Sequence, residues 1–133
     1  MANFDTSFQI ESIQTFHIAL EGAYWEDYRR DEVVSATERF EFKAGWPTVY
    51  ALSIETALVK IKFSDGTTGW GEANVPIGPE VFCLVLENLV QPMAKGREFG
   101  HPGDLNEYLY LAQRGRGELS GFWQDALAGL DIA

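Results

Sequence analysis

Several residue types with catalytic or ligand-binding chemistry occur in this sequence, and their spacing decides whether they form a site. Gly66, Gly69 and Gly71 make a glycine-rich run, but their order differs from that of a dinucleotide-binding loop. The run also leads into a predicted strand, so no helix N-terminus is available there for a phosphate. The two histidines, His17 and His101, have no partner at zinc-binding spacing. We interpret the glycines as turn and close-packing positions and predict no metal ligand in this chain.

Other reactive side chains have structural interpretations that we favour over functional ones. The charged run at 26–32, EDYRRDE, is typical of a solvated face or loop. Arg114 and Arg116 lie between glycines, where a flexible loop between helices is a simpler reading than an anion site. Cys83 is the only cysteine and sits in an apolar run, which predicts a buried small side chain and no disulfide. His17 reads as a solvated or hydrogen-bonded strand histidine, and Glu72 as a structural hydrogen-bonding partner.

Composition limits the class of protein. The chain has 133 residues, 46% of them hydrophobic and 14% aromatic, which suits one folded domain or a piece of a larger one. Its net charge of −10 disfavours nucleic acid and anionic membranes as partners. We see no signal peptide, and no apolar run approaches the ~20 residues of a membrane span. We therefore expect a soluble, cytoplasmic protein.

The elements that position these residues begin with a predicted β-hairpin at 52–73. Ala57, Val59, Ile61 and Phe63 alternate with a more polar register, as in a half-buried strand. The tetrapeptide 64–67, Ser-Asp-Gly-Thr, has the chemistry of a tight turn, and 69–72 resumes an extended run. A lone hairpin is marginally stable in water, so the rest of the chain must cover its apolar face.

Residues before the hairpin predict one strand and one irregular segment. The segment 9–20 is rich in β-branched and aromatic residues and is read as a strand, with Ile10, Ser12, Gln14, Phe16, Ile18 and Leu20 in one register. Residues 21–50, which we call the flap, show no clean helical or strand period, although 39–43 fits a short strand. Long irregular connections of this kind are usually functional lids or disordered segments, and the flap's many aromatic residues argue against disorder.

Three helices are predicted after the hairpin, at about 79–92, 104–114 and 120–133. Pro79 suits the first position of a helix, Glu80 complements its dipole, and Pro92 with Gly96 is expected to end it. Asp104 and Glu107 have the spacing of a capping box for the second helix, and Ser120 fits a cap for the third. The last helical pattern still runs at Ala133 without a C-cap signal, so we expect the natural protein to continue.

Two stretches of this sequence resemble a known family. The hairpin SDGTTGWGEA and the closing DALAGLDIA look like the N-terminal capping domain of the enolase superfamily, in its mandelate racemase and muconate-lactonizing branch. The resemblance implies an α+β domain over 1–133, with a three-stranded antiparallel meander followed by a three-helix bundle. It also implies a (β/α)8 barrel after this chain, and none of the barrel's positions is present here.

The same resemblance implies a function for the intact protein. Family members use Mg²⁺ in the barrel and a Lys or His base that removes the proton α to a carboxylate, so we predict no catalytic or metal residue in this chain and no activity for it alone. The loops 21–50 and 74–79 would close over the substrate. On that basis Arg29 or Arg30 would meet a carboxylate or sugar hydroxyls, and Tyr24, Trp25 and Trp46 would form a stacking wall.

The expected reaction of the intact protein is dehydration, racemisation or cycloisomerisation, with an acid sugar as the expected substrate. The implied partners are the barrel, the substrate and further copies of the chain in a homo-oligomer. The alternative is a self-sufficient interaction or ligand-binding module without catalysis, which the uncapped C-terminal pattern disfavours.

Overall fold

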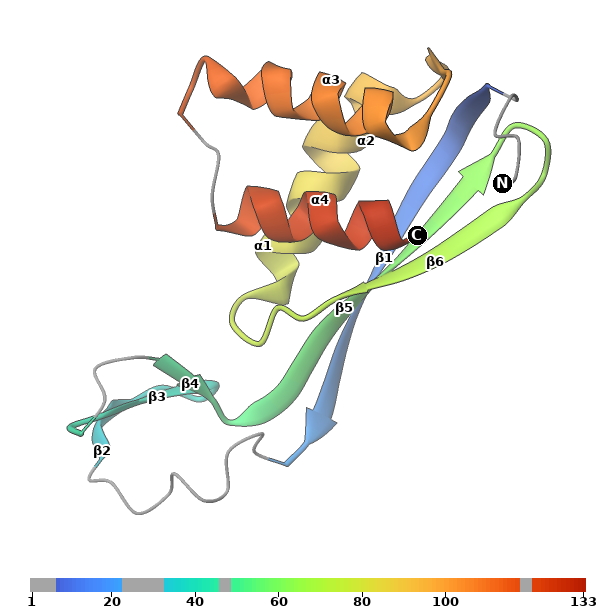
Figure 1. The fold of residues 1–133 in the computed structure, drawn as a ribbon. Coiled ribbons are helices and arrows are strands. Elements are labelled where there is room, and N and C mark those ends of the chain that lie inside the picture. Colours follow the sequence, from blue (N-terminus) through green and yellow to red (C-terminus); the bar gives the residue numbers. More distant parts are fainter. Residues whose placement is uncertain (1–6, 23–32, 46–48, 118–120) are drawn as a thin grey trace, which may run out of the picture.

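The computed structural model describes residues 7–22, 33–45, 49–117 and 121–133, and Figure 1 shows their arrangement. The strands are β1 (Phe8–Glu21), β2 (Val33–Ala36), β3 (Phe40–Lys43), β4 (Val49–Ala51), β5 (Ser53–Phe63), β6 (Thr68–Ala73) and β7 (Glu98–Phe99). The helices are α1 (Pro79–Leu84), the π-helical turn η2 (Val85–Val90), α2 (Gln91–Ala94), α3 (Pro102–Arg114) and α4 (Phe122–Ile132). The predicted α+β fold class is confirmed.

The main sheet has the strand order β6-β5-β1-β7. β1 pairs antiparallel with β5, and β5 pairs antiparallel with β6. The predicted turn closes this hairpin: the Asp65 carboxylate accepts a hydrogen bond from the Thr67 N–H at 2.8 Å, and Gly66 has a φ of 90°. The short edge strand β7, which the sequence did not predict, pairs with the start of β1.

A bulge changes the register of β1 near its start. Ile10 pairs with Phe63 and Ser12 with Lys62, so one extra residue of β1 lies between these pairs. Ile10 is therefore buried on the same face as Ile13, although strict alternation put the two on opposite faces. From Ser12 onwards the predicted alternation holds, with Phe16 pairing with Leu58 on the outer face.

The first predicted helix is longer than expected and contains a wide turn. Helical structure runs through α1, η2 and α2, from Pro79 to Ala94. The prediction that Pro92 ends this helix is wrong, since Pro92 lies inside α2. The π-helical turn before Pro92 explains why a proline is accommodated within the helix. Its wider i→i+5 hydrogen bonding relieves the clash of the proline ring with the preceding turn. None of the helices in the described ranges is long and apolar enough to cross a membrane.

The start of α3 differs from the predicted capping box. The helix begins at Pro102, and the cap is His101, whose Nδ1 accepts a hydrogen bond from the Gly103 N–H at 3.0 Å. Asp104 lies inside the first turn, where its charge suits the helix dipole. The last helix begins at Phe122 after Gly121, and the predicted cap Ser120 lies outside the described residues.

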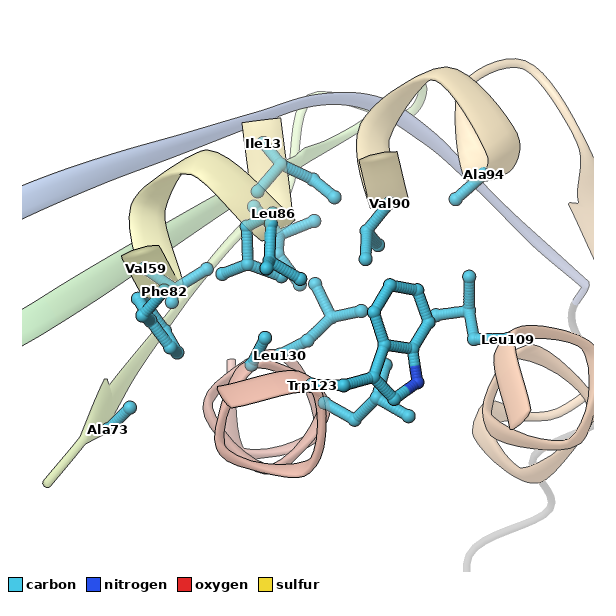
Figure 2. Packing of buried hydrophobic residues seen from close by; sticks show 14 of the residues in the cluster. Ile13, Val59, Ala73, Phe82, Leu86, Val90, Ala94, Leu109, Trp123 and Leu130 are labelled. Atoms are coloured by element: carbon cyan, nitrogen blue, oxygen red, sulfur yellow. The ribbon is translucent and has the colours of Figure 1, made fainter. Parts of the chain in front are cut away.

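The helices cover one face of the main sheet and form the core with it (Figures 1 and 2). Val59 of β5 and Leu86 of η2 are fully buried, and Trp123 of α4 lies between the helices in Figure 2. Of the face predicted for the first helix, Phe82, Val85, Leu86 and Val90 are buried, but Val81 and Leu89 are exposed. The buried face of this helix is therefore narrower than the sequence predicted.

Close packing of α4 on β6 depends on glycines, as the sequence predicted. A Cβ at Gly71 would meet the Gly129 carbonyl oxygen at 2.2 Å, and one at Gly69 would meet the Ala133 oxygen at 1.6 Å. Any larger residue there would have to push the helix away from the sheet.

The flap contains a second sheet that the sequence predicted only in part. β2, β3 and β4 form a three-stranded antiparallel sheet, which we call the flap sheet. The expected short strand at 39–43 corresponds to β3, whereas β2 and β4 were not predicted because their segments are short and lack a clear period. The flap sheet lies beyond the ends of β1 and β5, away from α2 and α3 (Figure 1).

Candidate functional site

The residues predicted to contact substrate are Tyr24, Trp25, Arg29, Arg30 and Trp46, and all five lie outside the described residues. Their role therefore stays a prediction. What the structure describes is the base of the flap, where the flap sheet meets β5, β1 and the start of α1.

Both predicted substrate loops meet at this base. Residues 74–78 connect β6 to α1, and Gly78 takes a left-handed conformation with a φ of 68° just before the helix. The turn between β2 and β3 reaches the same place, because the guanidinium of Arg39 donates a short hydrogen bond to the Glu80 carboxylate. The described part of the flap and the loop after the hairpin therefore lie side by side.

Four charged or titratable side chains form a network here, which we call the charge network: His17, Arg39, Glu55 and Glu80. Arg39 Nη2 donates to Glu55 Oε2 at 2.7 Å, while Arg39 Nη1 donates to Glu80 Oε1. His17 Nε2 lies 3.3 Å from Glu55 Oε2, and His17 Nδ1 lies 3.9 Å from Glu80 Oε1. The Ser53 hydroxyl donates to the other oxygen of Glu55 at 2.7 Å.

The sheet register places Glu55 at the centre of this network. It lies on β5 in the same register as Ala57 and Val59, so its side chain points to the buried face and is 2% exposed. A carboxylate in that position is costly unless it is paired and hydrogen-bonded. Arg39 and Ser53 donate hydrogen bonds to the Glu55 carboxylate. His17, on the neighbouring strand β1, lies within ion-pairing distance of it.

The electrostatics favour the ionised forms of Arg39, Glu55 and Glu80. Hydrogen bonds to Glu80 and Glu55 raise the pKa of the Arg39 guanidinium, and the same bond lowers the pKa of the Glu80 carboxyl. Burial acts to raise the pKa of Glu55, but hydrogen bonds from Ser53 and Arg39 and the nearby positive charge outweigh it, so that pKa is also lowered. Arg39 has both terminal nitrogens engaged, so the arrangement is suited to holding elements together.

Sequence reasoning missed the charge network, although one signal was present. Glu55 interrupts the apolar register of Ala57, Val59 and Ile61, and a charge in a buried register implies a buried partner. The identity of that partner was not accessible, because Arg39 is 16 residues away from Glu55 and 41 from Glu80. Of the features that were predicted, Glu72 does make a structural hydrogen bond, from the Thr56 hydroxyl at 2.9 Å.

Lys43 is a second buried charge in the flap sheet. Its side chain is 3% exposed, and its Nζ lies 3.1 Å from Glu41 Oε1 on the same strand. The Glu41 carboxylate therefore compensates the buried charge of Lys43.

A hollow at the opposite end of the main sheet from the flap does not suit a carboxylate. It has a volume of about 550 Å³ and lies between the start of β1, the β5–β6 turn, the start of α3 and the end of α4. Its charged lining residues are Asp65 and Asp131, which would repel a carboxylate. The base of the flap is the better candidate.

Metal binding has no support in the described residues. No group of three or more His, Cys, Asp or Glu side chains there is placed to hold a metal ion, and the charge network already has Arg39 between its two carboxylates. The charge network, as the described residues form it, therefore does not fit a magnesium site.

The fold matches solved structures of one superfamily. A member of the enolase superfamily from Agrobacterium tumefaciens is 28% identical and superposes with a TM-score of 0.86, over 96% of this chain and 33% of that one. A mandelate racemase/muconate lactonizing enzyme from Bordetella bronchiseptica RB50 is 23% identical, with a TM-score of 0.64 over 96% of this chain and 29% of that one. A racemase from Streptomyces coelicolor A3(2), solved with bound magnesium, is 18% identical, with a TM-score of 0.63 over 93% and 30%.

These likenesses confirm the predicted resemblance. The fold is that of the enolase superfamily. The chain spans about a third of the length of the structures it matches, which fits an N-terminal capping domain. No protein-family model and no curated protein matches the chain.

Proposed function

We propose that this chain is the capping domain of a longer enzyme of the mandelate racemase type, which removes the proton α to a carboxylate. The observation that carries the proposal is the structural match over nearly the whole chain to about a third of an enolase-superfamily protein. In this proposal a barrel outside the present sequence performs the chemistry, and the chain alone is inactive.

The flap and residues 74–79 supply specificity in this proposal. Closure of a lid over a reaction site excludes water and lets contacts at the far end of the substrate choose between molecules. The adjacency of Arg39 and Glu80 supports a shared role for the two segments, because it joins them at one edge of the domain. The polar residues Arg29 and Arg30, with the aromatic Tyr24, Trp25 and Trp46, favour an acid sugar as substrate.

Magnesium is part of the proposal only for the longer protein. A racemase with the same fold was solved with bound magnesium, whereas the described residues here offer no metal site. A homo-oligomeric state and a cytoplasmic location belong to the same proposal.

The first test is the intact mass of the protein encoded by the full gene. A mass near three times that of this chain is expected. The longer protein with Mg²⁺ should then exchange the α-proton of at least one acid sugar for deuterium in D₂O, observed by NMR. A full gene product of 133 residues with no such exchange would instead support an interaction module.

The second test uses flap variants of the longer protein. Arg29→Gln and Arg30→Gln should raise KM by about tenfold or more for the variant whose side chain meets a charged group, since such hydrogen bonds are worth ~1.5–3 kcal/mol. The exposed Arg114→Gln at the end of α3 is the matched control and should leave KM unchanged. If the KM values of all three variants were equal, neither Arg29 nor Arg30 would contact the substrate.

A further inference from the structure

The described residues of the flap sheet make no contact with the hydrophobic core that would hold the flap sheet against the rest of the domain. None of the described residues between Val33 and Ala51 belongs to the buried hydrophobic core, which lies between the main sheet and the helices. The flap sheet joins β5 through Leu52 and extends beyond the end of the main sheet (Figure 1). Among the described residues, the contacts that join the flap sheet to β5 and α1 are therefore the polar ones made by Arg39.

Arg39 is well placed to make those contacts. It lies in the turn between β2 and β3, where the Thr37 hydroxyl accepts hydrogen bonds from the Arg39 and Phe40 N–H groups at 3.3 and 3.0 Å. The Arg39 carbonyl accepts a hydrogen bond from the Leu52 N–H at 2.9 Å. The Arg39 guanidinium also lies over the Phe40 ring, which further restricts the arginine side chain. The backbone that carries the Arg39 side chain is therefore held in place by hydrogen bonds.

From that turn the guanidinium reaches two different elements of the domain at once. One nitrogen binds Glu55 on β5 and the other binds Glu80 at the start of α1. A planar guanidinium with fixed donors defines both a distance and an angle, which a single point charge would not do.

We propose that Arg39 is the positioning residue of the flap sheet: by bridging Glu55 and Glu80 it fixes the orientation of the flap sheet against β5 and the start of α1. This proposal rests on the proposed function only for its consequence, which is that the flap is held ready over a substrate. The bridge itself is a property of this chain.

The two carboxylates have different parts in the bridge. Glu55 is buried and tied to Ser53 and His17 as well, so its position is set by the main sheet. Glu80 is half exposed, and its side chain meets Arg39 from the helix side. Removing Glu80 therefore weakens the bridge without leaving a charge unpaired in the interior, which makes it the safer variant for a test.

The test is hydrogen–deuterium exchange of the 133-residue chain, read by mass spectrometry on peptides covering 33–51. Arg39→Gln also breaks the bond to buried Glu55 and should speed exchange in these peptides by about tenfold. Glu80→Gln should speed it by about threefold to fivefold, because the Arg39–Glu80 pair is half exposed. The double variant should exchange no faster than Arg39→Gln alone, because both changes remove the same bridge. Arg114→Gln is the matched control and should leave exchange in 33–51 unchanged.

Peptides from 53–73 and 79–94 distinguish positioning from general stability. Their exchange should stay within about twofold of the wild type in Glu80→Gln, and its thermal midpoint should barely move. Unchanged exchange in 33–51, or an equal rise throughout the chain, would overturn the proposal. The measurement uses neither substrate nor metal, so its outcome is independent of whether the proposed enzymatic function is correct.

Discussion

At the scale of single residues, Glu55 shows how the fold changes the chemistry of a side chain. Its carboxylate is almost fully buried, yet its pKa is lowered because hydrogen bonds from Ser53 and Arg39 and nearby positive charge exceed the opposing effect of burial. A carboxyl whose pKa is lower in the folded state stabilises the fold above its ordinary pKa. That stabilisation is lost as the pH falls through the folded value.

The pH dependence of stability follows from this sign. We expect the free energy of unfolding to fall as the pH drops below the ordinary carboxyl pKa of about 4.3, with Glu80 contributing in the same direction. Glu55→Gln should lower it by ~1.5–3 kcal/mol at pH 6, and the difference should shrink as the pH falls and the wild-type carboxyl becomes protonated. Urea denaturation at several pH values measures this. Glu107→Gln on the surface of α3 is the control, and a difference that stays constant with pH would contradict the expectation.

At the scale of elements, the packing of α4 on β6 depends on the absence of side chains. A Cβ added to Gly71 on the strand would collide with the Gly129 carbonyl oxygen of the helix, and one added to Gly129 would lie 2.9 Å from the Phe82 ring. This close approach brings α4 onto the sheet and lets its larger side chains, Trp123 and Leu130, fill the core.

Gly71→Ala should therefore destabilise the domain. The added Cβ would lie 2.2 Å from the Gly129 carbonyl oxygen, so α4 must shift, at a cost of ~1–3 kcal/mol. Gly115→Ala is the matched control, because nothing lies within 4 Å of its Cβ and its φ of −65° suits alanine. Thermal unfolding followed by circular dichroism compares the two, and equal midpoints would show that the helix adjusts without cost.

At the scale of the whole molecule, the helices cover one face of the main sheet, and no other described element covers the opposite face (Figure 1). The outer face carries Phe16 and Trp70, stacked with ring centroids 5.6 Å apart and 41% and 53% exposed, and the Lys60 ammonium lies 5.4 Å from the Trp70 ring. Leu20 on the same strand as Phe16 is also exposed. Contiguous apolar groups of this kind are uncommon on the free surface of a monomer.

The isolated chain should accordingly bind a hydrophobic dye through this face. Replacing Phe16 and Trp70 with serine should reduce the dye fluorescence clearly, while far-ultraviolet circular dichroism stays the same. Val81→Ser, at an exposed position on α1, is the control and should change the fluorescence little. Undiminished dye binding in the double variant would place the apolar surface elsewhere.

Local patterns were sufficient for the parts of the fold in which neighbours in sequence are also neighbours in space. The turn at 64–67, the alternation along β5 and the start of α1 at Pro79 all follow from short-range rules, and the structure confirms them. The same rules misplaced the end of the first helix at Pro92 and the cap of α3 at Asp104. In both places a competing local arrangement, a wide π-turn and the His101 side chain, satisfied the backbone instead.

The sequence by itself therefore determined the order of the long strands and the main helices, the α+β class and, through the hairpin and final-helix motifs, the resemblance to the enolase superfamily. Only the tertiary structure decided that β2 and β4 join β3 in a sheet, that a bulge turns Ile10 inward, and that Arg39 meets Glu55 and Glu80. The physical reason is that these features depend on contacts between residues far apart in the chain. Such contacts form only when the whole sheet and its helices have packed.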